Sequence, residues 1–396
     1  MSPGWLHVFS ILSILLCLGC EHSSETTVGL QGVTSIPQEY KPVQCQANWE
    51  FELTDEEKMN EQGLYKVLVI YDSIYLQSLA SFMIDFSNGL RAKGWHVFDA
   101  TKMRHSLKED LYAATGIDRY PDIVVVFNSE EDHVEKIQPG KTPSSLVIDW
   151  VDEVHEEHVA RGLRKGLNTG VFDAVFPRYH HAVLRTVEPL TPRCFQMPHA
   201  ASEHFFQKID EQSKRETVLL SGAIRPNHYP LRCKAALLME KGLSPIVQRT
   251  HPGYEYMSDP EAEGKNYSQD ISKHWLAISG GGLEPGVRAP YVYAKHFEIP
   301  AAGTALLTDE ELIPYLKEYG FIAGQHYIAT NRDNLQTTIE HWLRPENRQE
   351  LLEITKRGQE LVQNQHRNVY RIDRLDRISL NLFHEKQRKI KANGRI

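Results

Sequence analysis

The pattern of apolar and polar positions changes near residue 64, where a polar segment gives way to alternating apolar runs and amphipathic stretches. The runs are short, continuous and rich in β-branched residues, which is typical of strands buried on both faces of a parallel sheet. Strands that alternate with helical segments predict an α/β layer fold. The strands expected in this first half are residues 65–71, 95–98, 122–127, 145–149, 172–176 and 193–197.

The pattern restarts after a charged connector at residues 208–215. A new strand is expected at residues 216–222, and Gly242 ends the helix that follows it. The later elements expected are strands at 245–248, 275–279 and 304–308 and helices at 334–343 and 346–365. We therefore predict two tandem Rossmann-like α/β domains with a cleft between them, because open α/β sheets bind ligands at the carboxyl ends of their strands.

The two ends of the chain differ from this pattern. Residues 1–20 carry no Lys, Arg, Asp or Glu and are almost wholly apolar from Val8 to Cys20, which predicts a signal peptide or a short membrane anchor. We expect entry into the secretory pathway or membrane association on the lumenal or extracellular side, although the run is shorter than a comfortable span and a cytoplasmic location stays open. The predicted segments are a stem at 21–63, an N-terminal domain at 64–207, a C-terminal domain at 216–371 and a basic tail at 372–396.

Composition narrows the class of partner. The chain has 396 residues, of which 41% are hydrophobic and 24% charged, as expected for a globular protein with two domains. Its formal net charge of −8 argues against nucleic acid as the main partner, because binding to a phosphate backbone needs a basic face. A local basic pocket for a phosphorylated small molecule remains compatible with this charge.

A strand–loop–helix at residues 221–232 has the features of an anion site, since the start of a helix presents unpaired N–H groups. Arg225 in the loop and Arg232 in the first helical turn add guanidinium groups suited to a diphosphate. Tyr229 is placed to stack on a base or to cover the core. The alternative is that both arginines are ordinary surface residues.

A second candidate lies in the segment that begins at Lys295. Glu298 is the single acidic residue of a short expected helix that breaks at Gly303 and leads through Thr304 into a strand. Small residues let a ligand approach the backbone, and a carboxylate can accept both hydroxyls of a ribose, as in dinucleotide-binding folds. The alternative is an amphipathic helix with a glycine stop.

These residues carry a family resemblance. Residues 229–232, residues 295–309 and the closing helices through Arg371 resemble the GT-B glycosyltransferases, in particular the CgeB-like, group 1-type branch. The resemblance implies a hexosyltransferase-type enzyme that moves a sugar from a nucleotide-sugar donor to a glycan, protein or small-molecule acceptor, without metal or cofactor. It implies that Glu298 holds the donor ribose, that Gly303 and Thr304 line the phosphates, and that Arg225 with Arg232 stabilises the leaving diphosphate.

One position departs from the family. Many retaining relatives have a second glutamate eight residues before the one that binds ribose, and this chain has Pro290 there. The departure keeps a second hypothesis open, a catalytically silent nucleotide- or glycan-binding protein on a GT-B scaffold. A GT-B-fold epimerase or hydrolase that acts on the nucleotide sugar is a third.

The first domain carries a candidate acid–base group at residues 149–158, just past an expected strand. His155 or Asp152 is expected to face the cleft and accept a proton from an acceptor hydroxyl. The competing candidates are His180 and His181, with Arg178 as a further cleft residue. The alternative is a solvated helix face.

Overall fold

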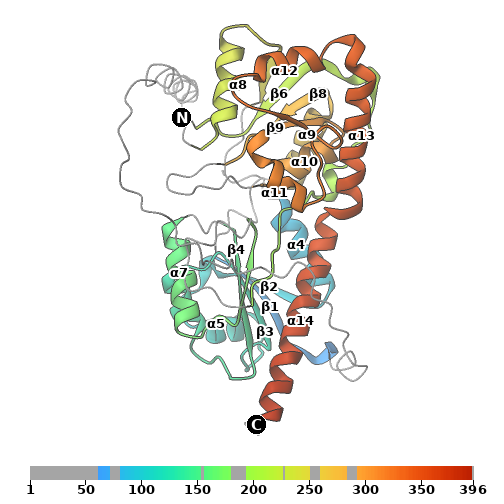
Figure 1. The fold of residues 1–396 in the computed structure, drawn as a ribbon. Helices are drawn as coiled ribbons and strands as arrows, with labels where there is room; N and C mark the ends of the chain where they lie inside the picture. Colours follow the sequence, from blue (N-terminus) through green and yellow to red (C-terminus); the bar gives the residue numbers. More distant parts are fainter. Residues whose placement is uncertain are drawn as a thin grey trace, which may run out of the picture. The chain divides into compact units, whose positions relative to one another are not determined.

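The computed structural model describes residues 61–71, 81–152, 156–179, 193–225, 228–249, 259–282 and 292–394 (Figure 1). These residues form two compact units. The N-terminal unit contains the described residues through Phe205 together with 259–266 and 363–394, and the C-terminal unit contains 206–249 and 267–362. The expected leader, residues 1–20, lies outside the described residues. Within the described chain, no helix has the length and apolar character needed to span a membrane.

The N-terminal unit is built on a five-stranded parallel sheet with strand order β2-β1-β3-β4-β5. All residues of β1 and β3 are buried, because helices cover both faces. The strands are β1 (Lys66–Ile70), β2 (Trp95–Asp99), β3 (Ile123–Phe127), β4 (Leu146–Val151) and β5 (Ala174–Pro177). The helices are α4 (Ser81–Ala92), α5 (Leu107–Thr115), α6 (Glu131–Ile137), α7 (Glu157–Asn168) and α14 (Asn368–Ala392), with 3-10 turns η1 (Glu61–Gly63), η2 (Ala100–Lys102) and η4 (Glu203–Phe205).

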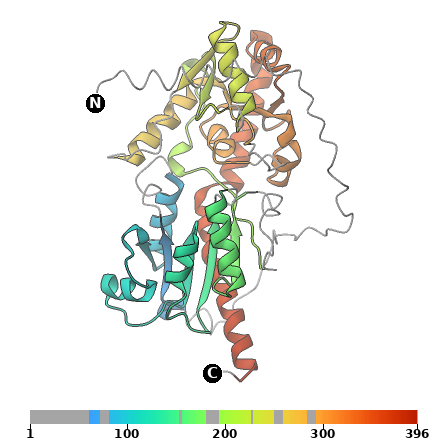
Figure 2. The same cartoon turned by 90° about the vertical axis from the view of Figure 1, so that its left-hand side faces the viewer.

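The last helix of the chain completes the core of the N-terminal unit. Met83 and Phe86 from α4 and Ile372 and Leu375 from α14 pack in one cluster with alternate residues of the strands. In Figures 1 and 2, α14 runs along this sheet, and Figure 1 shows α5 and α7 on the opposite side. The helix therefore supplies apolar surface that the N-terminal half of the chain lacks.

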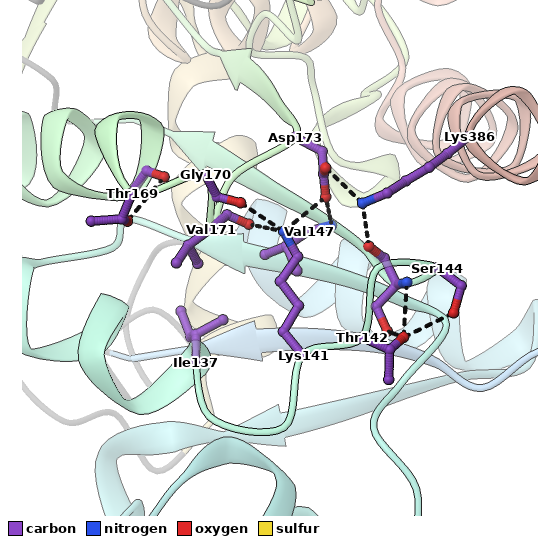
Figure 3. Close-up of polar contacts among 12 residues, drawn as sticks. Ile137, Lys141, Thr142, Ser144, Val147, Thr169, Gly170, Val171, Asp173 and Lys386 are labelled. Atoms are coloured by element: carbon purple, nitrogen blue, oxygen red, sulfur yellow. Dashed lines mark hydrogen bonds and ion pairs between the residues drawn. The ribbon is translucent and has the colours of Figure 1, made fainter. Parts of the chain in front are cut away.

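This placement corrects the expected basic tail at residues 372–396. Lys386 is held inside the unit, since its Nζ donates to Asp173 at 2.7 Å and to the Ser145 carbonyl at 2.6 Å (Figure 3). Asp173 also pairs with Lys141 at 3.3 Å. Charge alone predicts a tail here, whereas the apolar residues between Arg371 and Lys386 recur at helical spacing and pack in the core.

The expected strand at residues 193–197 is also corrected. This segment makes only an isolated bridge between Cys194 and Val175 of β5. Phe195 and Met197 still donate backbone hydrogen bonds to Val175 and Pro177. Pro177 has no N–H to return, so a regular ladder cannot extend beyond this point.

The C-terminal unit repeats the topology of the first. Its five parallel strands have the order β10-β9-β8-β6-β7. Read from β7, this order has the same connectivity as β2-β1-β3-β4-β5 in the N-terminal unit. The strands are β6 (Arg215–Ser221), β7 (Ile246–Arg249), β8 (His274–Ile278), β9 (Ala305–Asp309) and β10 (Ile328–Thr330). The helices are α8 (Pro230–Glu240), α10 (Lys295–Ala301), α11 (Ile313–Glu318) and α12 (Leu335–Trp342), with 3-10 turns η5 (Glu211–Ser213), η6 (Glu310–Leu312) and η7 (Pro345–Asn347). Two further helices, α9 (Pro260–Ser272) and α13 (Arg348–Gln365), belong to this unit at residues 267–272 and 348–362.

One face of this second sheet packs on α8, α12 and α13. Leu231 and Ala235 from α8, Ile339 from α12 and Leu351 from α13 share a core cluster with Leu220 and other strand residues. Two five-stranded parallel sheets enclosed by helices confirm the predicted α/β class with two Rossmann-like units.

Candidate functional site

The carboxyl edge of the C-terminal sheet is the place where the topology favours a ligand. Neighbouring strands β6 and β8 connect onward in opposite directions, to β7 and to β9, so the sheet has its switch point between them. Ligands of open α/β sheets bind outside the carboxyl ends of the strands at such a point. Here β6 ends at Ser221, which Gly222 follows, and β8 is followed by Ser279 and Gly280.

Arg232 lies at this edge. It is in the first turn of α8, whose Pro230 fits the first helical position because that position needs no N–H bond. The side chain is only 2% exposed. Its Nη1 donates to the Ala223 carbonyl at 3.2 Å and its Nη2 to the hydroxyl of Tyr293, while the ring of Tyr229 lies 4.1 Å from the guanidinium carbon. No carboxylate forms an ion pair with Arg232 among the described residues.

Lys295 approaches the same turn from the start of α10. A Cβ built on Gly222 would lie 2.8 Å from Nη1 of Arg232 and 3.0 Å from Cε of Lys295, and Gly222 has a φ of +95°. Glycine is therefore needed here for both space and backbone conformation. The Lys295 ammonium donates to the Tyr267 hydroxyl at 2.6 Å, and that hydroxyl is 2.7 Å from Ser221 Oγ.

Glu298 is one turn further along α10. Its carboxylate has no hydrogen-bond partner in the described part of the chain. Loss of water raises the pKa of Glu298, and the nearby Lys295 ammonium opposes that rise. A partly buried carboxylate without a donor is suited to accept hydrogen bonds from a ligand.

Asp309 closes the edge at the end of β9. Its Oδ2 accepts the Gly281 N–H at 2.6 Å, which fixes the loop after β8. Loss of water raises the pKa of Asp309 to about 6, and Glu311 adds to the rise, while the Gly281 bond and the charge of Arg232 oppose it.

The structure groups only some of the residues expected from the sequence. Arg232, Tyr229 and Glu298 belong to the carboxyl edge and to α10. Arg225 is in the loop after β6, but its side chain is exposed and has no partner within the described residues. Its backbone carbonyl accepts the Tyr229 N–H at 2.7 Å, and the role expected for its side chain at the diphosphate stays a prediction.

Gly303 and Thr304 lie at the opposite, amino end of the sheet. Thr304 Oγ1 donates to the carbonyls of Ile271 and His274 at 2.8 and 3.0 Å, directly before β9 begins. The Gly303 carbonyl accepts from Lys214 at 2.7 Å. Because phosphates are expected at the carboxyl edge, this placement speaks against the phosphate contacts expected for both residues.

In the N-terminal unit, Asp152 is part of a closed charged cluster after β4. Its carboxylate lies 3.6 Å from Arg178 Nε and 3.5 Å from His199 Nε2. Arg178 Nη1 is 2.6 Å from His199 Nδ1, and since a guanidinium only donates, Nδ1 accepts and the His199 proton is on Nε2. Burial alone would raise the pKa of Asp152, but Arg178 and His199 outweigh it and lower the pKa to about 2.

A buried carboxylate with so low a pKa is a weak proton acceptor. The arrangement therefore favours a structural role for Asp152 over the role in proton transfer expected from the sequence. His155, His180 and His181 lie outside the described residues, so their expected roles stay predictions. Arg178 is buried beneath Phe82 rather than exposed to a ligand, with 3.8 Å between its guanidinium carbon and the ring centre.

One group in the described chain has the donor set of a metal site. Oxygen and nitrogen atoms of Glu130, Asp132 and His133 lie within 4.8 Å of one another at the start of α6. His133 Nδ1 already accepts the Glu130 N–H at 3.0 Å, and its ring stacks on Tyr71. The expectation that no metal is required stays a prediction.

Sequence reasoning missed several residues of both groups. They are Tyr267, Tyr293, Lys295 and Asp309 in the C-terminal unit and His199 in the N-terminal unit. Only the places of Lys295 and Asp309 in the sequence could have indicated them. Lys295 begins the segment that contains Glu298, and Asp309 directly follows the strand expected at residues 304–308.

Comparisons with known proteins find similarity in part of the sequence and in the fold. Residues 287–377 match the family model described as "Glycosyl transferase-like". An α-glucosyltransferase in complex with UDP superposes with a TM-score of 0.52 at 10% identity, over 80% of this chain and 99% of that one. An α-glucosyltransferase in complex with UDP-glucose and DNA superposes with a TM-score of 0.51 at 11% identity, over 80% of this chain and 99% of that one. The Anabaena protein HepE, in complex with UDP and glucose, gives 0.53 at 10% identity, over 79% and 99%.

The fold is GT-B. The two Rossmann-like units of the chain superpose on solved GT-B structures whose sequences are 10% identical to it. No curated protein sequence matches the chain. Four of the matched structures, the one with UDP-glucose among them, were solved with DNA. The expectation that this chain does not bind nucleic acid rests on its net charge of −8 and stays a prediction.

Proposed function

We propose that this chain is a glycosyltransferase that takes a sugar from a nucleotide-sugar donor bound at the carboxyl edge of its C-terminal sheet. The observation that carries the proposal is the pair Arg232 and Lys295, which flank Gly222 at the switch point and form no ion pair with a carboxylate of the described residues. Two such cations beside a glycine turn favour a diphosphate. The match of residues 287–377 to a glycosyltransferase-like family supports the same reading.

The chemistry follows from charge. Transfer of the sugar leaves negative charge on the departing nucleoside diphosphate, and positive groups already in place at that position stabilise the transition state. Arg232 offers a planar fork for two phosphate oxygens, and Lys295 offers a point charge. We propose on this basis that the reaction needs no metal.

Glu298 has a separate role in the proposal. Its carboxylate, which lacks a donor within the described residues, accepts the hydroxyls of the donor ribose. Hydrogen bonds to an ionised group contribute about 1.5–3 kcal/mol each in mutational series. We also propose that the transferred sugar is a hexose and that the acceptor is a glycan, a protein or a small molecule. Membership of the CgeB-like branch is part of the same proposal.

A thermal-shift screen with UDP, GDP and ADP tests the proposal. A ligand at a hundred times its dissociation constant adds about 2.7 kcal/mol of stability, so an authentic donor site raises the melting temperature. Glu298→Gln should remove most of that gain. Glu240→Gln, at the exposed end of α8, is the matched control and should leave it unchanged.

Turnover is tested by release of UDP from a UDP-sugar in the presence and absence of EDTA. Release that persists in EDTA supports transfer or hydrolysis without metal. If no nucleotide raises the melting temperature of the wild type, the proposal is wrong. Binding without release would favour the catalytically silent alternative.

We further propose that the chain enters the secretory pathway, or is anchored to a membrane on its lumenal or extracellular side. Cys194 is disulfide-bonded, and disulfides persist mainly in oxidising compartments. Mass spectrometry of the protein from its native source, under non-reducing conditions, tests this. A reduced Cys194 there would contradict it.

A further inference from the structure

Tyr293 occupies a bridging position between Arg232 and the loop that follows β8. Its hydroxyl accepts a hydrogen bond from Arg232 Nη2 and donates one to the Gly280 carbonyl. Its ring centre is 5.2 Å from the guanidinium carbon. One hydroxyl thus connects the cation at the start of α8 to the backbone at the end of β8.

The loop that anchors Tyr293 is itself fixed. Asp309 Oδ2 accepts the Gly281 N–H at 2.6 Å. A Cβ built on Gly280 would lie 3.0 Å from that same oxygen and 3.1 Å from Leu231 Cβ, so the backbone is held closely between β9 and α8. The position of the Gly280 carbonyl, and with it the position of the Tyr293 hydroxyl, is therefore set by the end of β9 and the start of α8.

This arrangement determines which donors of Arg232 remain for a ligand. A guanidinium has five N–H donors in a fixed plane. The Ala223 carbonyl takes one from Nη1 and Tyr293 takes one from Nη2, while the buried Nε has no hydrogen-bond partner among the described residues. With two acceptors fixed, rotation of the plane is restricted and the remaining N–H groups keep one direction.

We propose that Tyr293 is a positioning residue for donor binding: its hydroxyl orients the Arg232 guanidinium toward the diphosphate of the nucleotide sugar. The inference rests on the proposed function, and it adds the residue that makes Arg232 an oriented rather than a mobile cation. Preorganised donors bind an anion better than flexible ones, because less freedom is lost on binding.

Calorimetric titration with UDP and with uridine tests this in the full chain. Tyr293→Phe keeps the ring and removes the hydroxyl. We expect UDP affinity to fall about tenfold, the size typical of one lost hydrogen bond to a charged group, while uridine affinity stays unchanged because uridine has no phosphate. The ratio of the two affinities within each variant cancels any difference in the amount of folded protein.

Tyr120→Phe is the matched control. It also removes the hydroxyl of a buried tyrosine, which donates to the Ile137 carbonyl at 2.9 Å in the N-terminal unit. We expect both affinities to be those of the wild type. In an Arg232→Gln background, Tyr293→Phe should cause no further loss of UDP affinity, because the hydroxyl acts through that guanidinium.

The outcomes separate the two proposals. A wild type that binds none of UDP, GDP and ADP overturns the proposed function and this inference together. Where GDP or ADP binds in place of UDP, the same titrations use that diphosphate and its nucleoside. A wild type that binds UDP, with Tyr293→Phe binding it equally well, overturns only the positioning role. Equal losses for UDP and uridine, or a full further loss in the Arg232→Gln background, would show that Tyr293 acts through packing and also overturn it.

Discussion

The carboxyl edges of the two sheets share a topology and differ in how their charges are balanced. In the N-terminal unit, Asp152, Arg178 and His199 are buried and contact one another, so the negative charge of the carboxylate is balanced inside a closed cluster. In the C-terminal unit, Arg232 and Lys295 face a glycine turn and contact tyrosine hydroxyls instead of carboxylates.

The difference shows that a shared fold does not fix chemistry. Charges that neutralise each other contribute to the integrity of the unit, whereas cations without a carboxylate leave attraction available to an anionic ligand. The comparison predicts that charge removal should act mainly on stability at one edge and mainly on binding at the other.

The largest expected effect is on stability. Asp152→Asn removes the carboxylate that lies 3.6 Å from Nε of the buried Arg178, and breaking such pairs costs about 3–5 kcal/mol. Chemical denaturation followed by fluorescence measures the free energy of unfolding. Glu157→Gln, which removes an exposed pair with Arg164, is the control and should cost less than about 1 kcal/mol. Equal losses in the two variants would contradict the closed-cluster interpretation.

The next effect is on binding. Arg232→Gln should lower UDP affinity about 10- to 100-fold, since hydrogen bonds to a charged group contribute about 1.5–3 kcal/mol. Its free energy of unfolding should stay within about 1 kcal/mol of the wild type, because no buried carboxylate loses a partner among the described residues. Denaturation and calorimetry on the same preparation measure both. A loss of stability as large as that of Asp152→Asn would remove the contrast between the edges.

The smallest effect is on pH dependence. The folded-state pKa of Asp309 is raised from 3.8 to about 6, so its contribution to stability is present below pH 4 and is lost as the pH rises through 6. Asp309→Asn cannot ionise and should therefore gain stability relative to the wild type above pH 6, on the order of 1 kcal/mol after screening by solvent. Thermal unfolding between pH 4 and 8 measures the difference. A difference that does not change with pH would contradict the raised pKa.

The sequence was sufficient to predict the class of fold, because buried parallel strands are continuous apolar runs such as residues 123–127. It was also sufficient to place Arg232 and Glu298 on helices that follow strand ends. It did not reveal Tyr293, because a single tyrosine in a loop has no periodicity, and its contacts depend on how α8 and the loop after β8 meet. Gly303 shows the opposite limit: its closeness to Glu298 in the sequence predicts a ligand contact, but Gly303 precedes β9 at the amino end of the strand.

The position of α14 has a consequence for how the chain matures. Residues 372–383 contribute to the first core, yet they are synthesised after the whole C-terminal unit. On a ribosome the first half of the protein would wait with part of its apolar surface uncovered, while residues 206–362 are already available to fold. A stop codon near residue 365 would thus harm the domain that was translated first.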